Sequence, residues 1–247
     1  MLVLDGNPIE LEAHLHRLSA SLADLFAAEL PGGAREAVLE GAQPLRRGKL
    51  RLTVAPGAVS MEAEVVATEL EPERIFPGPE HGVALCGVLV EGGLGPHKWA
   101  DRRLLERAEA GAPGELPLLV DSDGAALEAA RGSLFTAGRG WLATPPLDGR
   151  ILPGIARRRT LEIAREQGIE VREQRLTLAD VHRGGAFLAG SVRGIEPVRS
   201  LDGTELPPAG EISARLAAGL QRRWLRAPEA EPVAAAAGGQ RGGRPAR

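Results

Sequence analysis

Two side chains of this sequence could carry out covalent and acid–base chemistry. Lys98 follows the glycine-rich turn GGLGP and is one of two lysines in a chain with many arginines. Lysine, unlike arginine, can lose its proton and form a Schiff base with an aldehyde. Glu128 lies among small and apolar residues in ALEAARGSLF, where a carboxylate can pair with the protonated ring nitrogen of a cofactor. On spacing alone, an exposed lysine and an exposed strand glutamate are the commoner situations.

The segment LPGIARR contains a candidate anion site. Pro153 and Gly154 precede a predicted helix, whose first amides, at Ile155 and Ala156, have no partner within the helix. Such amides point toward the helix N-terminus, where the helix dipole favours negative charge. An ordinary helix start has the same sequence pattern, so this segment needs support from elsewhere in the chain.

Two weaker signals also indicate a bound anion. Gly190 and Ser191 follow the apolar segment AFLA, and small residues allow a backbone to approach a phosphate closely. Arg17 lies beside a leucine stripe in HLHRLSASL, and an arginine there can bind a phosphate bidentately. The alternatives are an ordinary turn and a solvated helix arginine. The basic runs at 46–49 and 157–159 are expected to be exposed charge.

Composition argues against several classes of protein. The single cysteine, Cys86, rules out an internal disulfide, and the histidines have no spacing typical of metal ligands, so no metal site is expected. The chain has no tyrosine, which excludes a mechanism that needs its own phenol. The net charge of −3 disfavours nucleic acid as a partner. No run reaches the roughly 18 apolar residues of a membrane span. The start MLVLDGNPIE lacks the basic region of a secretory signal, which favours a cytoplasmic protein.

Residues 1–72 are predicted to form a small α+β domain. It begins with LVLDGNP, a predicted strand and turn. Leucines then recur every three or four residues from Leu11 to Leu25, which predicts a helix with one apolar face. Two segments of alternating apolar and polar residues flank Pro56-Gly57 and predict a hairpin.

Residues 73–80 are expected to be a linker, because prolines are frequent there and periodicity is absent. A large domain is predicted over 81–226, with strands at VALCGVLVEG and GWLAT and a helix at PGIARRRTLEIAREQG. The segment LPLLVDSDGAALEAARGSLFTA predicts strand, turn and strand, with the turn at Asp123-Gly124. Residues 227–247 contain mainly Ala, Gly, Pro and Arg, which predicts a disordered tail.

Taken in order, these motifs resemble the class IV aminotransferases, the pyridoxal-phosphate enzymes of fold type IV. The resemblance covers most of residues 1–205. The segments that carry it are EAHLHRLSASL, HKWADRRLLERA, LEAARGSLF, the stretch from LATPPLDGR to LTLADV, and LAGSVRGIEPVRSLDG. It implies a two-domain α+β fold similar to D-amino-acid aminotransferase, with pyridoxal 5′-phosphate as the cofactor.

The resemblance also implies roles for individual residues. Lys98 matches the lysine that forms a Schiff base with the cofactor and later transfers a proton. Glu128 matches the carboxylate that pairs with the cofactor's pyridine nitrogen. The implied cofactor-phosphate site comprises Arg17, Gly154, Ile155, Ala156, Gly190, Ser191 and Val192.

The sequence departs from the family pattern in three respects. The family usually has threonine where Ala156 stands, so one hydroxyl contact with the phosphate is lost. Branched-chain enzymes have a tyrosine soon after the lysine to hold the cofactor's phenolate oxygen, whereas here Arg102 and Arg103 are the candidates for that contact. Family members also begin with further strands, including a stretch similar to FET before the equivalent of LVLDG. Because Met1 lies inside this motif, the small domain is expected to lack its first strands.

Within the family, the block KWADRR is most similar to that of aminodeoxychorismate lyase. The expected reaction converts 4-amino-4-deoxychorismate to 4-aminobenzoate and pyruvate, a step that supplies a folate precursor. The alternatives are a branched-chain or D-amino-acid aminotransferase that uses 2-oxoglutarate, and a degenerate relative without catalysis. The resemblance also implies a homodimer, since family members build the pocket partly from the neighbouring subunit's small domain.

Overall fold

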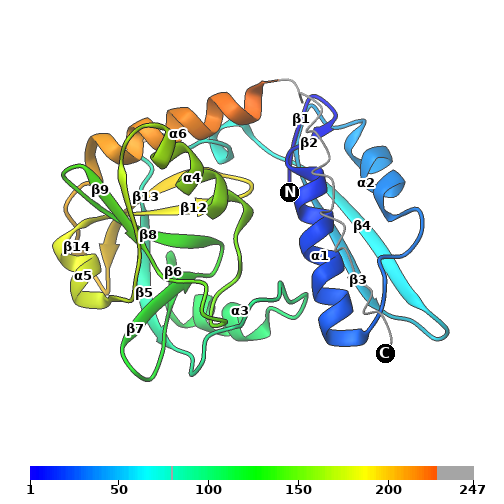
Figure 1. Ribbon diagram of the computed structural model, residues 1–247, viewed down its shortest axis with the longest axis horizontal. Helices are drawn as coiled ribbons and strands as arrows, with labels where there is room; N and C mark the ends of the chain where they lie inside the picture. The colour runs from blue at the N-terminus through cyan, green and yellow to red at the C-terminus, as the bar shows by residue number, and fades with distance from the viewer. Residues whose placement is uncertain (79, 227–247) are drawn as a thin grey trace, which may run out of the picture.

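The computed structural model describes residues 1–78 and 80–226, and two β-sheets with flanking helices give it the predicted α+β class (Figure 1). The predicted tail, 227–247, and residue 79 of the predicted linker lie outside the described residues. In the part that is described, no helix is both long enough and apolar enough to cross a membrane.

The smaller sheet, formed by described residues near the N-terminus, has four strands in the order β2-β1-β3-β4. All neighbours in it are antiparallel. The strands are β1 (Leu2–Leu4), β2 (Asn7–Pro8), β3 (Arg47–Pro56) and β4 (Met61–Glu69). The long β3–β4 hairpin matches the prediction from alternating residues, because one side of β3 is buried and the other is not.

Two helices pack on this small sheet. α1 (Leu11–Phe26) and α2 (Ala34–Ala42) form a core cluster with buried Leu50 of β3. The leucine stripe correctly predicts α1, because a helix places side chains three and four residues apart on one face. The stripe is not buried throughout: Leu22 is 2% exposed, whereas Leu25 near the helix end is 39% exposed.

The larger sheet has ten strands among the described residues, in the order β10-β9-β8-β12-β13-β5-β6-β7-β11, with β14 paired to β13. They are β5 (Val83–Leu89), β6 (Glu115–Val120), β7 (Ala125–Ala129), β8 (Gly132–Gly138), β9 (Trp141–Thr144), β10 (Glu170–Glu173), β11 (Leu176–Thr177), β12 (Gly185–Gly190), β13 (Gly194–Leu201) and β14 (Thr204–Glu205). β7 also pairs with β8, so the path from β8 through β12, β13, β5 and β6 to β7 closes into a ring. Such closure leaves these strands without free edges.

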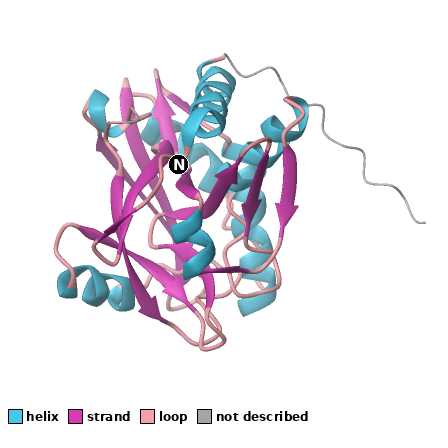
Figure 2. Ribbon diagram, turned by 90° about the vertical axis from the view of Figure 1, so that its left-hand side faces the viewer, coloured by secondary structure: helices cyan, strands magenta, loops and turns pink. Residues whose placement is uncertain are grey.

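Two hydrophobic clusters lie on opposite faces of the larger sheet. Leu134 and Phe135 are adjacent in β8 but belong to different clusters, as the alternation of side chains along a strand requires. Phe135 stacks on Phe187 of β12 at 5.0 Å between ring centroids. The Phe135 cluster includes residues of the two long helices α4 (Ile155–Glu166) and α6 (Gly210–Leu225). Figure 2 shows the strands with helices packed beside them.

Two shorter helices and one 3₁₀ turn complete the described chain. α3 (Arg103–Gly111) contacts β6, and α5 (Leu178–Arg183) begins with a capping box between Thr177 and Asp180. The 3₁₀ turn spans Pro72–Arg74, inside the region around the predicted linker. Ordered local structure therefore continues through much of the connection between the sheets.

The structure differs from the sequence prediction in three places. The segment predicted as strand, turn and strand forms three strands, because a second tight turn at Ala130-Arg131 separates β7 from β8. In the predicted linker, Ile75 is buried in the Phe135 cluster and does not lie in solvent. The expectation of exposed charge is wrong for Arg157, which is 3% exposed, because its guanidinium turns inward to the Pro145 carbonyl. It is also wrong for Arg159, whose side chain is 15% exposed because it pairs with Glu10.

Candidate active site

Glu128 lies at the closed end of the β7–β8 hairpin, directly opposite Ser133. Its side chain is buried, and one carboxylate oxygen accepts a hydrogen bond from the Leu152 amide at 3.1 Å. Burial raises the pKa of Glu128 to about 7, although this hydrogen bond and the cations Lys98 and Arg17 act in the opposite direction. The carboxyl group therefore titrates in the range where functional acids and bases often do.

The start of α4 lies against the same hairpin. Gly154 is the N-cap residue, and no side chain caps the helix, so the first amides at Ile155 and Ala156 receive no side-chain cap. A Cβ atom added to Gly154 would lie 2.7 Å from Ser133 Oγ. A side chain at position 154 would therefore crowd Ser133, whose hydroxyl lies between the start of α4 and the strand that carries Glu128.

The β12–β13 turn lies next to this hairpin. Gly190 pairs with Gly194 across the turn, and Ser191 and Val192 between them are half-buried. A Cβ atom on Gly190 would lie 2.9 Å from the Arg131 carbonyl oxygen, in the turn between β7 and β8. The strand pairing of β12 with β8 thus brings the two predicted anion-binding segments to one end of the larger sheet.

Arg17 reaches this region from the other sheet. It lies on α1, the helix of the small sheet that runs beside the large sheet in Figure 1. Its guanidinium Nη1 donates a hydrogen bond to the Pro153 carbonyl at 3.3 Å, just before the start of α4. Burial lowers the pKa of Arg17, and the nearby Glu128 carboxylate partly opposes that effect. The structure therefore places the predicted arginine beside the predicted helix N-terminus.

Lys98 lies in the loop between β5 and α3, near both Glu128 and Arg17. Protein surrounds much of its side chain, although solvent still reaches it. Burial lowers the pKa of Lys98 to about 8, with further lowering by the cations Arg17, Arg102 and Arg51 and an opposing effect of Glu128. An amine with this pKa is partly neutral near pH 7 to 8, so it can act as a nucleophile and as a base.

Neighbouring side chains hold the Lys98 loop in place. His97 Nδ1 lies 3.1 Å from Ser21 Oγ of α1, which ties the loop to the small sheet's helix. On the other side of the lysine, Trp99 Nε1 donates to the Leu94 carbonyl at 2.9 Å. Lys98 is therefore flanked by two anchored aromatic side chains.

The two arginines predicted near the cofactor's phenolate oxygen have different positions. Arg102 donates a hydrogen bond to the Ala130 carbonyl at 3.1 Å, on the same hairpin as Glu128, and contributes to the lowered pKa of Lys98. Arg103 pairs with Asp101, and its side chain is 77% exposed. The structure therefore brings Arg102, and not Arg103, toward the lysine.

Sequence reasoning missed two residues of this region. Ser133 contacts the start of α4, and only the strand pairing reveals its position opposite Glu128. Arg51 lies on β3, where buried Leu50 next to it faces the small sheet's core, so Arg51 points to the other side. No local motif marks either residue, although the alternation along β3 indicates which face Arg51 occupies.

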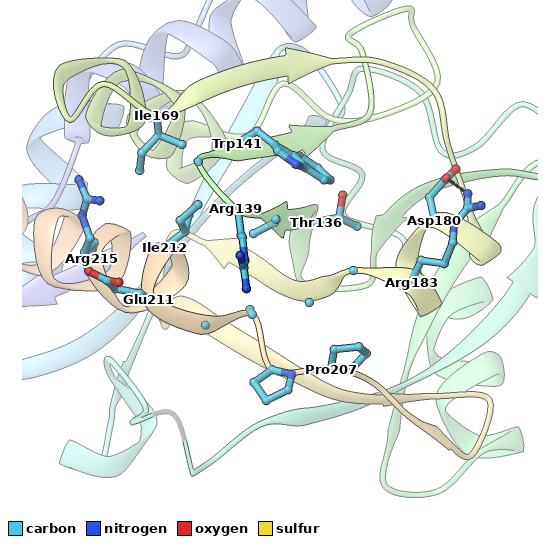
Figure 3. Close-up of a pocket in the computed structure, with 18 of the residues that line it drawn as sticks. Thr136, Arg139, Trp141, Ile169, Asp180, Arg183, Pro207, Glu211, Ile212 and Arg215 are labelled. Atoms are coloured by element: carbon cyan, nitrogen blue, oxygen red, sulfur yellow. Dashed lines mark hydrogen bonds and ion pairs between the residues drawn. The ribbon is translucent and has the colours of Figure 1, made fainter.

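A cavity of about 950 Å³ lies elsewhere, beside the start of α6 (Figure 3). Its lining includes Arg139, Trp141, Asp180, Arg183 and Arg215. None of the residues predicted for catalysis or cofactor binding lines it. The groups around Lys98 and this cavity are therefore separate features of the described chain.

Comparison with known proteins gives two kinds of relative. Part of the chain is 39% identical to the branched-chain-amino-acid aminotransferase of Escherichia coli, over 36% of this chain and 29% of that enzyme. The match thus spans less than a third of the length of the branched-chain enzyme. The bifunctional aminodeoxychorismate lyase / D-amino acid transaminase of Mycobacterium tuberculosis is 29% identical, over 87% of this chain and 86% of that protein.

Solved structures with the same fold include lyases and aminotransferases. A putative 4-amino-4-deoxychorismate lyase from Legionella pneumophila has a TM-score of 0.78 at 20% identity, covering 90% of this chain and 88% of that one. A hypothetical aminotransferase from M. tuberculosis, in its α-ketoglutarate and PMP bound form, has a TM-score of 0.75 at 26% identity, covering 90% and 87%. The same M. tuberculosis protein is also known in a PLP-bound form.

A family model for "Amino-transferase class IV" matches residues 1–201. The match contains every residue predicted here to bind the cofactor or to act on a substrate. It agrees with the fold and with the convergence of a low-pKa lysine, a buried carboxyl group and a helix N-terminus without a side-chain cap. The chain belongs to the class IV aminotransferase family, whose cofactor is pyridoxal 5′-phosphate.

Proposed function

We propose that pyridoxal phosphate binds where these groups converge, with its phosphate against Arg17 and the start of α4. The donor set suits a dianion: one guanidinium, the uncapped amides at Ile155 and Ala156, and the nearby β12–β13 turn with Ser191. Glycine at position 154 keeps a Cβ atom from crowding Ser133 Oγ and Arg157 at this helix start. The loss of the family's threonine at Ala156 leaves backbone amides as the main donors there.

Glu128 and Lys98 would act at the opposite end of the cofactor. A pyridine nitrogen placed against Glu128 would share its proton with a carboxyl group of pKa about 7. The bound cofactor supplies an electron-poor ring that accepts electrons from a substrate carbon. Lys98, with a pKa of about 8, can hold the cofactor and then exchange protons with that carbon. Arg102 is the candidate near the cofactor's phenolate oxygen in the absence of tyrosine.

We infer that the reaction is the conversion of 4-amino-4-deoxychorismate to 4-aminobenzoate and pyruvate. The observation that carries this choice is the excess of positive charge beside Lys98. Arg51 and Arg102 both act on its pKa, and neither is needed for the cofactor phosphate. The substrate carries two carboxylates, and Arg51, which has no proposed contact with the cofactor, suits one of them. The near full-length match to the bifunctional M. tuberculosis protein is compatible with this choice.

In this reaction Lys98 moves a proton through its Nζ atom. Its neutral Nζ accepts the proton from the ring carbon that bears the substrate's amine. The bond to the enolpyruvyl oxygen then breaks, the ring becomes aromatic, and the departing three-carbon unit takes up a proton to become pyruvate. A pKa of about 8 allows the amine to accept a proton and return it near neutral pH.

Transamination of a branched-chain or D-amino acid, with 2-oxoglutarate as acceptor, is the second candidate. The 39% identity to the E. coli branched-chain enzyme favours it over the 36% of this chain that the match covers. The printed name of the M. tuberculosis relative joins both activities in one protein. Both reactions would use Lys98, Glu128 and Arg17 in the same way, so they differ mainly in what contacts the substrate.

The two reactions are separated by their products. Purified protein with added pyridoxal phosphate is incubated with 4-amino-4-deoxychorismate, and pyruvate is measured by a coupled dehydrogenase. Parallel samples contain D-alanine or L-leucine with 2-oxoglutarate, and glutamate is measured. We expect pyruvate from the first mixture, lost in Lys98→Ala. Amino transfer without pyruvate from the first mixture would refute the lyase proposal, and a colourless, inactive protein would favour the degenerate relative.

We also propose a cytoplasmic homodimer. The outer edge of β4 has no strand partner within the described chain, and Val66 on this strand is 46% exposed. An unpaired edge with exposed apolar residues is suited to contact with another chain. Light scattering during gel filtration should give twice the mass of the chain, and a monomeric mass would contradict this proposal.

A further inference from the structure

A buried ion pair joins the start of α1 to the middle of α4. Arg159 Nε and Nη2 donate hydrogen bonds to the two carboxylate oxygens of Glu10, at 2.5 and 2.7 Å. The side chain of Glu10 is 9% exposed and that of Arg159 is 15% exposed. A bidentate pair of this kind fixes direction as well as distance, because both partners are planar.

The same two helices meet at a second point, at the candidate phosphate site. There Arg17 of α1 donates to the Pro153 carbonyl, just before α4 begins. Along α1, Glu10 and Arg17 are about 10 Å apart on the same face. Arg159 and Pro153 are separated by a similar length of chain. The Glu10–Arg159 pair therefore aligns the helices two turns away from the point where Arg17 acts.

Further contacts hold Arg159 in position. Its Nη1 donates to Glu162 at 2.9 Å, and Glu162 also accepts a hydrogen bond from Arg223 of α6 at 3.2 Å. Apolar contacts lie close by: Ile9 packs against the cluster that contains α4 and α6 residues. Apolar burial has no preferred direction, so it holds the two parts together without fixing how α1 is turned.

We propose that Glu10 and Arg159 are positioning residues for the cofactor phosphate. Their bidentate pair sets the distance and rotation of α1 against α4, so that the Arg17 guanidinium and the α4 amides meet at one anion. This inference rests on the phosphate placement proposed above. Its consequence is specific: loss of the pair should weaken contacts to the phosphate and leave contacts to the cofactor ring unchanged.

The test compares two ligands that differ only in the phosphate. Dissociation constants for pyridoxal 5′-phosphate and for pyridoxal are measured by quenching of tryptophan fluorescence, with Trp99 beside Lys98 as a reporter. The dissociation constant for pyridoxal divided by that for pyridoxal 5′-phosphate measures the phosphate's contribution to affinity. Glu10→Gln should lower this ratio about tenfold, since a misplaced group loses most of its effect, with pyridoxal binding unchanged. Arg17→Ala should lower the ratio at least as much.

Two controls separate positioning from folding. Glu12→Gln removes the exposed Glu12–Arg35 pair on the same helix and should leave the ratio unchanged. Arg159→Lys keeps the charge but loses the bidentate geometry, so it should lower the ratio even if Glu10→Gln fails to fold.

Three results would count against the inference. Equal weakening of both ligands would show a merely structural role for the pair. An unchanged ratio in Glu10→Gln, together with a lowered ratio in Arg17→Ala, would overturn the inference and retain the proposed site. An unchanged ratio in Arg17→Ala would overturn the phosphate placement itself.

Discussion

The Lys98 region and the cavity beside α6 both contain arginines and carboxylates, but these groups are arranged differently. Around Lys98, Glu128 is buried and Arg17 is half-buried, and the pKa values of Lys98, Glu128 and Arg17 all move in the direction that burial requires. In the cavity, Asp180 is held by Arg183 and by its capping box, which lowers its pKa.

The comparison shows that cavity size alone does not identify the site of chemistry. The cavity of about 950 Å³ is open and lined by residues such as Arg139, which Figure 3 shows extending into it. The Lys98 region has groups whose charged forms are costly without a ligand. Burial of unneutralised charge is destabilising, and such groups are therefore kept where a bound ligand needs them.

The largest expected effect is that of Lys98→Ala. Without the amine, the protein loses both the covalent attachment of the cofactor and the proton transfer, so the turnover rate should fall by about 10,000-fold. The absorption band of the Schiff base between the cofactor and the protein should also be absent. Lys49→Arg, at the other lysine of the chain, should keep most of the activity. Equal losses of turnover in Lys98→Ala and Lys49→Arg would contradict a specific catalytic role for Lys98.

Glu128→Gln should have the next largest effect. An amide cannot balance the charge of a protonated pyridine nitrogen, so the turnover rate should fall by about 100-fold. The matched control is Asp180→Asn in the cavity, which breaks a capping box and should cost about 1 kcal/mol of stability. Its activity per folded molecule should remain. Steady-state rates and thermal unfolding of both variants measure the difference, and a larger loss of turnover in Asp180→Asn would reverse the comparison.

An effect of intermediate size is expected from pH on the rate at which pyridoxal phosphate reacts with Lys98. Lys98 reacts as the neutral amine, so the rate of colour formation with excess pyridoxal phosphate should rise about tenfold per pH unit below pH 8 and level off above it. Arg102→Ala removes a cation that lowers the pKa of Lys98, which should move the midpoint to higher pH. Stopped-flow absorbance measures both profiles. A wild-type midpoint near 10.5, the ordinary value, would show that Lys98 is solvated.

The smallest effect is expected in the cavity. Arg139→Ala and Arg215→Ala remove charge from a cavity that none of the predicted site residues lines. Each should change the turnover rate by less than about twofold and stability by about 0.5 kcal/mol or less. A large loss of activity in either variant would show that the chemistry takes place at the cavity and not around Lys98.

Local sequence signals were sufficient for most elements of the fold. The leucine stripe predicts α1. Pro153 and Gly154 at the start and Gly168 at the end predict α4, because both signals depend on residues close together in the chain. The second turn at Ala130-Arg131 was missed because no glycine or proline occupies its centre. Buried Arg157 was missed because its partners, Pro145 and Glu173, come from other segments.

The sequence by itself determined the types of group available: one lysine in a glycine-rich context, a glutamate among small residues, and a helix start able to bind an anion. Only the tertiary structure decided that these groups lie together, since strand pairing and the packing of α1 against α4 bring them from distant parts of the chain. It also selected Arg102 over Arg103 and added Ser133 and Arg51. The physical reason is that burial and neighbouring charge, which shift the pKa values of Lys98 and Glu128, are properties of the folded surroundings and not of a residue's type.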